Sequence, residues 1–142
     1  MSIPFGVHIP FVANLGFTLE KFENGTSELH YSPRPEHLNS FAITHGGAVM
    51  TLLDVVMATA ARSVAHEMGV VTIEMKSSFM RPAQAKAGEH LVAQGLLLHR
   101  TATMAFTDGK VYDAAGQLCA HATGTFKYVK RTPSLTSPIS TD

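Results

Sequence analysis

The chain has 142 residues, 45% of them hydrophobic, which is enough for one domain with a sizeable core. Lysine plus arginine equals aspartate plus glutamate, 11 each, so the basic excess typical of nucleic-acid-binding proteins is absent. A single cysteine, Cys119, excludes an intrachain disulfide. The first residues lack a signal-peptide pattern, and the most apolar stretch, 48–61, is too short to span a bilayer. We expect a cytoplasmic protein without nucleic-acid or membrane partners.

The first predicted elements are two strands. Residues 4–14 are expected to form a short helix or an irregular arm, followed by strands at 16–22 and 26–31. Asn24-Gly25 predicts a hairpin between these strands, because both residues tolerate positive φ. Pro33 and Pro35, with few periodic apolar positions around them, indicate a loop over 32–44.

A single long helix is predicted next, from Gly46 to about Glu67. The stretch is rich in Ala, Leu and Met and contains no proline and no glycine after Gly47. Thr44 is the expected N-cap, and Gly69 stands where a C-terminal glycine stop is expected.

The remainder favours β structure. Strands are expected at 70–80, over 89–107 with a break near Arg100, and at 117–129, and Asp108-Gly109 and Ala115-Gly116 are predicted turns. Residues 1–130 should form one domain, and residues 131–142, rich in Ser, Thr and Pro, a disordered tail. One helix cannot alternate with several strands, so we expect an α+β fold in which a mostly antiparallel sheet wraps the helix.

Asp54 is out of place in this helix. Apolar residues occupy every face over 48–61, which predicts burial all round, and no cation lies three or four residues from Asp54. A buried carboxylate is costly unless it is paired, so Asp54 should find a distant partner, stay protonated, or line a cavity for water or ligand. Desolvation would raise its pKa and suit a general base. The alternative is that Asp54 faces solvent on a thin polar strip with Thr51, or meets an arginine of a neighbouring subunit.

The start of the helix offers a second feature, His45-Gly46-Gly47. The first N–H groups of a helix are unpaired and carry partial positive charge, so glycine there makes an oxyanion hole physically possible. The alternative is an ordinary glycine-rich helix entry. Gly46 and Asp54 are separated by about 12 Å along the axis, too far to act on one reacting group within a chain. If both serve one reaction, a two-fold dimer with antiparallel helices is required.

The run Asn39-x5-His45-Gly46-Gly47-x6-Asp54 resembles the signature of the phenylacetate-pathway (PaaI-type) hotdog thioesterases. The segments VTIEMKSSFMRPA and GQLCAHATGTFKYV are also similar to that family, and the resemblance spans residues 11–130. It implies a hotdog fold, a curved antiparallel sheet around one central helix. It further implies a homodimer, often a dimer of dimers, and hydrolysis of an acyl-CoA to a free acid and CoA.

The resemblance also implies roles for individual residues. Asp54 would act as general base or nucleophile, with the Thr72 hydroxyl holding the attacking water. The partner subunit would supply Gly46, whose N–H polarises the carbonyl, and Asn39 and His45, which orient the carbonyl or the water. The candidates for substrate contacts are Gly47, Arg81, His99 and Arg100.

The sequence departs from the family pattern at two places. Ala42 stands three residues after Asn39, where the family often has glycine. The segment His99-Arg100-Thr101-Ala102 stands where many relatives carry a His-x-Gly-Arg turn for the CoA phosphates.

Two other functions remain open at this point. A hotdog dehydratase or hydratase could use His45 and Asp54 as acid and base, and a non-catalytic acyl-CoA binding module would need neither. The apolar lining favours an aromatic or medium-chain acyl group. No cofactor is predicted, and no metal site, because the eight histidines show neither HxH nor HExxH spacing.

Overall fold

The computed structural model describes residues 2–131. The tail predicted to be disordered therefore lies outside the described residues from position 132 onward. The elements, in chain order, are α1 (Pro10–Leu15), β1 (Thr18–Glu23), β2 (Thr26–Tyr31), a 3-10 turn (Pro35–His37), α2 (Gly46–Arg62), β3 (Met68–Phe79), β4 (Leu91–Arg100), β5 (Met104–Tyr112) and β6 (Leu118–Lys130).

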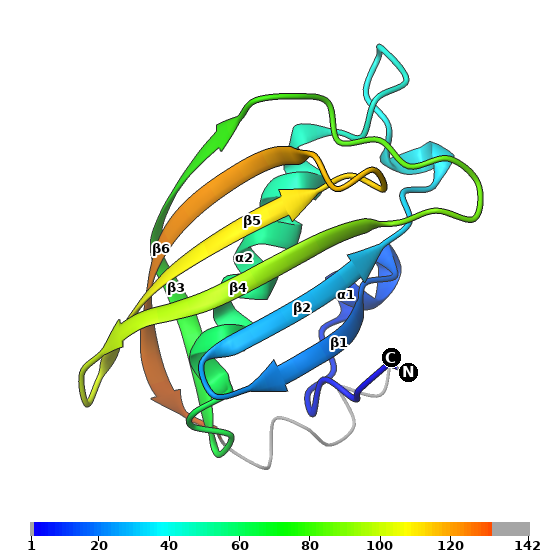
Figure 1. Cartoon of the computed structure of the whole chain (residues 1–142). Coiled ribbons are helices and arrows are strands. Elements are labelled where there is room, and N and C mark those ends of the chain that lie inside the picture. Colours follow the sequence, from blue (N-terminus) through cyan, green and yellow to red (C-terminus); the bar gives the residue numbers. More distant parts are fainter. Residues whose placement is uncertain (1, 132–142) are drawn as a thin grey trace.

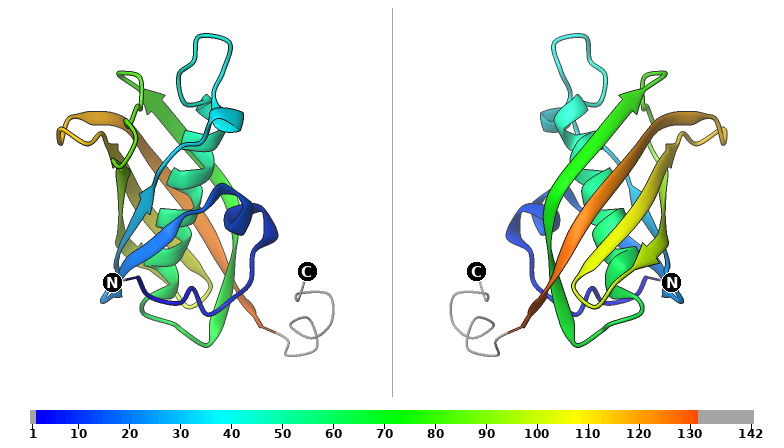
Figure 2. Two further views of the ribbon diagram at one scale, coloured as in Figure 1. Left: turned by 90° about the vertical axis from the view of Figure 1, so that its right-hand side faces the viewer. Right: turned by 90° about the vertical axis from the view of Figure 1, so that its left-hand side faces the viewer.

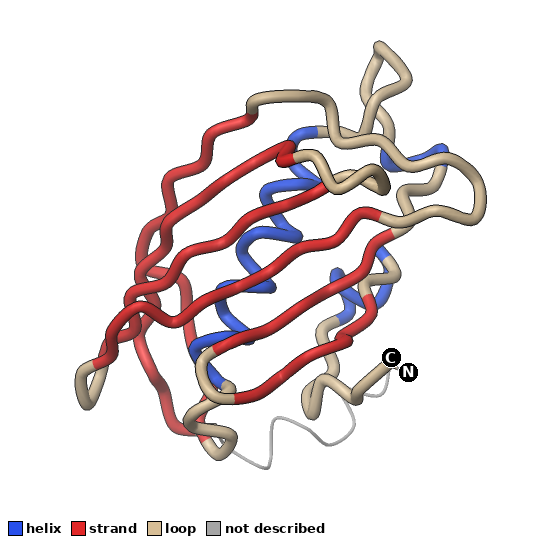
Figure 3. Tube along the Cα trace, in the orientation of Figure 1, coloured by secondary structure: helices blue, strands red, loops and turns tan. Residues whose placement is uncertain are grey.

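The six strands form one antiparallel sheet in the order β1-β2-β4-β5-β6-β3 (Figure 1). The sheet curves around α2, which lies along its inner side, as the two turned views show (Figure 2). The other helical segments are short (Figure 3). This architecture confirms the predicted α+β hotdog fold. None of the helices within residues 2–131 is long and apolar enough to cross a membrane.

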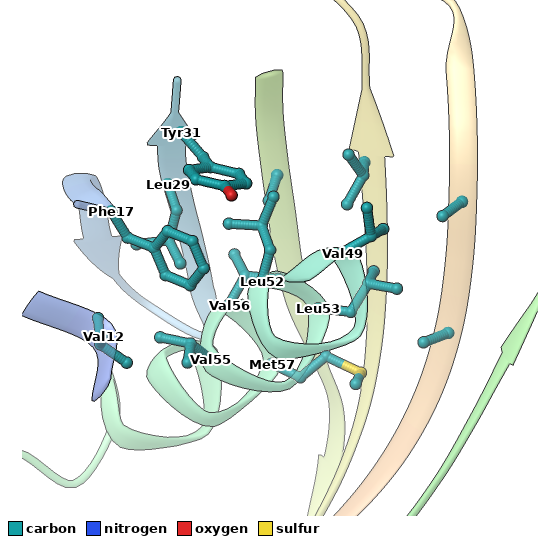
Figure 4. Close-up of a cluster of buried hydrophobic side chains, with 14 of the residues drawn as sticks. Val12, Phe17, Leu29, Tyr31, Val49, Leu52, Leu53, Val55, Val56 and Met57 are labelled. Atoms are coloured by element: carbon teal, nitrogen blue, oxygen red, sulfur yellow. The ribbon is translucent and has the colours of Figure 1, made fainter. Parts of the chain in front are cut away.

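The core lies between α2 and the inner face of the sheet. The side chains of Leu52, Leu53, Val56 and Met57 are fully buried and point from α2 toward the strands (Figure 4). Sheet glycines allow close approach of the helix: a Cβ added at Gly95 would overlap the Val56 carbonyl oxygen. The helix is thereby fixed against β4, β5 and β6, which sets the direction of every side chain along it.

The predicted start of α2 is correct, but its N-cap is not. His45 is the N-cap, because its imidazole Nδ1 accepts a hydrogen bond from the Gly47 amide at 2.8 Å. Thr44, the predicted cap, is buried and pairs with Leu38 in an isolated β-bridge.

The end of α2 was predicted too late. The helix ends at Arg62, not near Glu67, because the Ser63 hydroxyl donates to the Ala60 carbonyl and terminates the last turn. Gly69 is not a helix stop; it lies inside β3.

One predicted turn was also wrong. Asp108-Gly109 lies within β5, where Gly109 faces the helix and a Cβ would meet the Met57 side chain at 2.9 Å. The real turn follows Arg100, close to the predicted break, where the Thr101 hydroxyl accepts a hydrogen bond from the Met104 amide at 3.0 Å. The hairpin at Asn24-Gly25 is confirmed, with φ of 52° and 82° at these residues.

Candidate active site

The sheet leaves one stripe of α2 uncovered. Gly47 and Met50 are exposed, and Asp54 and Ala58 are partly buried, all on the face generated by three- and four-residue spacing. The prediction that the helix is buried on all sides was therefore wrong. The sequence is apolar on this face as well, and the only carboxylate of the helix stands in its middle.

Asp54 has a neutral partner from the neighbouring strand. The Thr72 hydroxyl on β3 donates a hydrogen bond of 2.7 Å to Asp54 Oδ1. Burial raises the pKa of Asp54 above the ordinary value of 3.8, and the Thr72 hydrogen bond lowers it by a smaller amount. Because Oδ1 is held by Thr72, Oδ2 is the oxygen left to accept a proton.

A cavity of about 430 Å³ opens beside this pair. Its walls come from residues 5–12, which we call the N-terminal arm, from α2, and from the start of β3. Apolar wall residues include Phe5, Val7, Ile9, Phe11, Val12 and Val55, while Asp54 and Thr72 stand at its polar side. A carboxylate next to an apolar chamber can act on a polar group at the end of an apolar ligand.

At the first turn of α2, the two glycine amides differ in their hydrogen bonds. The Gly47 N–H is engaged by His45 Nδ1, whereas the Gly46 N–H donates to no acceptor among residues 2–131. An Nδ1 that accepts a hydrogen bond carries no proton, so a neutral His45 holds its proton on Nε2. The helix start therefore presents two donors, the Gly46 amide and the His45 Nε2–H.

Asn39 organises the loop before the helix. Its Oδ1 accepts hydrogen bonds from the amides of Phe41 at 2.9 Å and Ile43 at 3.2 Å. Its side-chain oxygen therefore shapes the loop, and its NH2 group remains available to a ligand. Ala42 inside this loop has φ of 59°, so the backbone keeps a left-handed conformation where the resembling family often has glycine.

The left-handed Ala42 gives a first testable prediction. Replacing Ala42 with glycine should raise the free energy of unfolding by about 0.5–1 kcal/mol, because relief of the left-handed conformation outweighs the added freedom of the unfolded chain. Urea unfolding of Ala42→Gly against the parent chain measures this. Ala87→Gly, in an exposed loop position without positive φ, should be destabilising. If both substitutions changed the free energy of unfolding by the same amount, the claim that Ala42 is strained would be wrong.

A second cavity, of about 350 Å³, holds the other half of the predicted site. Asn39, Gly46 and Arg81 line it together with Phe79, but Asp54 and Thr72 do not. The predicted catalytic residues therefore form two groups within one chain: Asp54 with Thr72, and Asn39 with Gly46 and the neighbouring His45.

The predicted substrate contacts Arg81, His99 and Arg100 do not form one cluster. Arg81 donates through Nε to the Leu118 carbonyl at 3.0 Å. At the end of β4, the His99 ring stacks on Phe106 and the Arg100 guanidinium lies 4.5 Å from the centre of the Tyr128 ring. His99 and Arg100 line neither cavity. The structure does not bring the three together, and their role in binding CoA stays a prediction.

β3 is an edge strand with exposed apolar side chains. It pairs with β6, and along its other edge no strand within residues 2–131 pairs with it. Val71, Ile73 and Phe79 are each about half exposed. Long exposed edges of this kind are usually covered in stable proteins.

Comparison with known proteins identifies the family. Residues 41–120, more than half of the chain, match the model of the thioesterase superfamily. The chain belongs to the thioesterase superfamily. The matched segment contains His45, Gly46, Asp54 and Thr72.

Individual relatives agree with this assignment. A Saccharolobus solfataricus protein provisionally named an esterase is 30% identical over 122 residues, or 86% of this chain and 79% of that protein. The medium/long-chain acyl-CoA thioesterase YigI of Escherichia coli K12 is 26% identical over 140 residues, covering 86% of this chain and 87% of YigI. The structure of the E. coli PaaI protein from the phenylacetic acid degradation operon superposes with a TM-score of 0.79 at 20% identity over 87% of each chain, which supports the fold. The predicted class, a thioester hydrolase of the hotdog fold, is confirmed.

Sequence reasoning missed two charged residues that line the cavity at the candidate site. Arg62 and Arg131 both line the chamber beside Asp54. Neither arginine is among the site residues predicted from the sequence. An arginine in the last turn of an otherwise apolar helix was the available signal, because such a residue is seldom buried without a reason.

Proposed function

We propose that this protein hydrolyses acyl-CoA thioesters, with Asp54 as general base or nucleophile and the Gly46 amide of the partner subunit as oxyanion donor. The observation that carries the proposal is the desolvated Asp54 carboxylate, held by Thr72 at the side of an apolar cavity. A carboxylate of raised pKa beside an apolar chamber is suited to accept a proton near neutral pH.

A composite site in a homodimer explains why the residues form two groups. Gly46 and Asp54 are separated by about 12 Å along α2, and they line different cavities. A two-fold axis that pairs the exposed stripes of α2 in antiparallel fashion would place Gly46 of each subunit opposite Asp54 of the other. The exposed apolar edge of β3 would be covered in the same assembly.

The proposed reaction gives a role to Asp54, Gly46, His45 and Asn39. Asp54 Oδ2 takes a proton from water, and the water oxygen attacks the thioester carbonyl carbon. Negative charge then develops on the carbonyl oxygen, where the Gly46 N–H and the positive end of the helix stabilise it. The His45 Nε2–H and the Asn39 NH2 group orient the carbonyl. Collapse of the intermediate breaks the carbon–sulfur bond, and the leaving CoA thiolate takes up the proton held on Asp54 Oδ2, which restores the carboxylate.

A covalent route uses the same residues. Asp54 would attack the carbonyl directly, expel CoA thiolate and leave an anhydride for water to open. A single turnover in oxygen-18 water distinguishes the routes, because label that appears first in Asp54 would exclude direct attack by water.

The hydratase alternative is less consistent with the geometry. It requires His45 and Asp54 to act as an acid and base pair, but His45 Nδ1 is engaged in capping α2. Free-thiol release from a panel of aromatic and medium-chain acyl-CoAs, measured beside hydration of an enoyl-CoA, tests the proposal. Thiol release with no hydration is expected. Hydration without thiol release, or tight binding without either reaction, would contradict it.

The pH dependence of hydrolysis should follow the pKa of Asp54, which depends on the hydrogen bond from Thr72. The active form is the carboxylate, so kcat/KM should rise as the pH increases through the pKa of Asp54. The Thr72 hydrogen bond favours the charged form. Thr72→Val should therefore move the midpoint to higher pH and lower kcat/KM at neutral pH by roughly tenfold, the loss expected for one hydrogen bond to a charged group.

A matched control uses another threonine whose hydroxyl donates to a carboxylate. Thr125 on β6 donates to Glu74 at 3.3 Å, away from both cavities. Thr125→Val should leave the midpoint unchanged. A midpoint that does not move in Thr72→Val would show that the titrating group is not Asp54.

A further inference from the structure

The cavity beside Asp54 contains a buried arginine without a carboxylate partner. Arg62 is only 8% exposed, yet no aspartate or glutamate among residues 2–131 forms a salt bridge with it. Its only hydrogen bond there is a long one of 3.4 Å from Nη2 to the Phe5 carbonyl, and its Nε is buried without an acceptor. Its Cζ lies 5.6 Å from the centre of the Phe22 ring, over the ring face, but this contact supplies no negative charge. Buried guanidinium groups are ordinarily paired with an anion, and no carboxylate among residues 2–131 pairs with this one.

A second arginine strengthens the positive charge at this position. Arg131 lines the same cavity and contributes to lowering the pKa of Arg62, after the larger effect of burial. Arg131 is held in place by hydrogen bonds from Nη1 to the His66 carbonyl at 3.2 Å and from Nη2 to the Gly6 carbonyl at 3.0 Å. Two guanidinium groups that repel each other at one cavity are the arrangement expected of an anion site.

Asp54 does not neutralise this pair. No salt bridge joins Asp54 to either arginine among residues 2–131, and the hydrogen-bond partner of Asp54 is the neutral Thr72. Asp54 and Arg62 lie two helical turns apart, about 12 Å along the axis, and both line the same chamber. The walls between them are mainly apolar, with Val55 and Ala58 from α2 and Phe5, Val7 and Phe11 from the arm. Thr59 of α2 also lines the chamber, but its hydroxyl donates a hydrogen bond to the Val55 carbonyl of the same helix.

These features describe a ligand with a reactive group at one end, an apolar middle and an anion at the other end. Building on the proposed function, the geometry points to an acyl-CoA substrate whose medium-length acyl group ends in a carboxylate. The thioester lies at Asp54, the methylene chain lies along the apolar walls, and Arg62 with Arg131 binds the terminal carboxylate. The preferred products are then a dicarboxylic acid and CoA.

The other source of an anion is a phosphate of CoA itself. The apolar walls favour the acyl carboxylate, because a phosphate there would draw the polar pantetheine arm through an apolar chamber. The two sources give different kinetics: a carboxylate site affects only substrates that carry the terminal carboxylate, whereas a phosphate site affects every acyl-CoA equally.

The test compares substrates of equal chain length. We expect the parent enzyme to hydrolyse adipoyl-CoA with a kcat/KM at least about tenfold above that for hexanoyl-CoA, and suberyl-CoA likewise above octanoyl-CoA. Arg62→Met removes the charge at similar length and should abolish the preference, while activity on hexanoyl-CoA remains. Arg62→Lys keeps the charge and should retain part of the preference. Lys110→Gln, on the outer face of β5, is the matched loss of a cation and should leave it unchanged.

Other outcomes overturn either the anion site or the proposed function, and the two failures can be told apart. If the parent enzyme hydrolyses hexanoyl-CoA as well as adipoyl-CoA, the anion site is wrong although the thioesterase proposal stands. Equal loss on both substrates in Arg62→Met would assign Arg62 to a CoA phosphate or to packing of the arm, and a fall in the melting temperature identifies packing. If no acyl-CoA is hydrolysed, the proposed function fails, and calorimetric binding of free adipate to the parent chain but not to Arg62→Met still tests the site.

Discussion

Asp54→Asn is expected to lower kcat for acyl-CoA hydrolysis by about a thousandfold, because the amide cannot accept the proton of the attacking water. The substitution is nearly isosteric, and the Thr72 hydroxyl can still donate to the remaining side-chain oxygen. Thiol release under saturating substrate measures the loss. If Asp54 is instead a nucleophile, the loss is as large, and the isotope experiment separates the two routes.

The same substitution should not destabilise the protein at neutral pH. The pKa of Asp54 is raised in the folded state, so its contribution to stability is present below the unfolded pKa and is lost as the pH rises through the folded value. Asparagine removes this loss, and the melting temperature of Asp54→Asn at neutral pH should equal or exceed that of the parent.

The control for the loss of activity is Asp108→Asn, a matched change on β5 away from both cavities, which should retain hydrolysis. Near-parental hydrolysis by Asp54→Asn would refute the assigned role.

Gly46→Pro is expected to lower kcat by about a hundredfold or more, the effect of removing one oxyanion donor. Proline lacks the N–H but suits the first position of a helix, so α2 should still form. His45 before it has φ of −59° and ψ of 138°, a conformation compatible with a following proline. Circular dichroism checks that the helix persists, and thiol release measures the activity.

Gly46→Ala is the matched control for the added side chain. Both substitutions introduce a Cβ that would lie 3.0 Å from the Phe79 ring, but alanine keeps the amide hydrogen. Gly46→Ala should therefore retain much more activity than Gly46→Pro. Equal losses would attribute the effect to the contact with Phe79, and the Gly46 amide would have no part in the reaction.

The sequence was sufficient to predict the order of elements and the fold. The apolar helix, the Asn24-Gly25 hairpin and the alternating strands are local patterns, and each produces its element in the structure. Element ends were less predictable because single contacts decide them. The Ser63 hydroxyl ends α2 earlier than composition indicates, and Gly109 looks like a turn residue but is required inside β5 for close packing against Met57.

Different kinds of sequence information predicted the different parts of the candidate site. Spacing along one helix was enough to separate Gly46 from Asp54 and to predict that a reaction using both needs a second subunit. The partner of Asp54 across the strands, Thr72, came from family resemblance, since hydrogen bonding between distant segments leaves no periodic signal. For the buried Arg62 the sequence offers one signal, an arginine in the last turn of an apolar helix, but its burial depends on how the N-terminal arm folds over the end of α2.

The proposal that each active site combines residues of two subunits is tested most directly by mixing two inactive variants. Asp54→Asn and Gly46→Pro chains, unfolded together in equal amounts and refolded, should regain about a quarter of the parental activity, since half of the dimers are mixed and each mixed dimer carries one intact site. Each variant refolded alone should stay inactive. A mixture with no more activity than the separate variants would contradict the composite site and place the whole reaction within one chain.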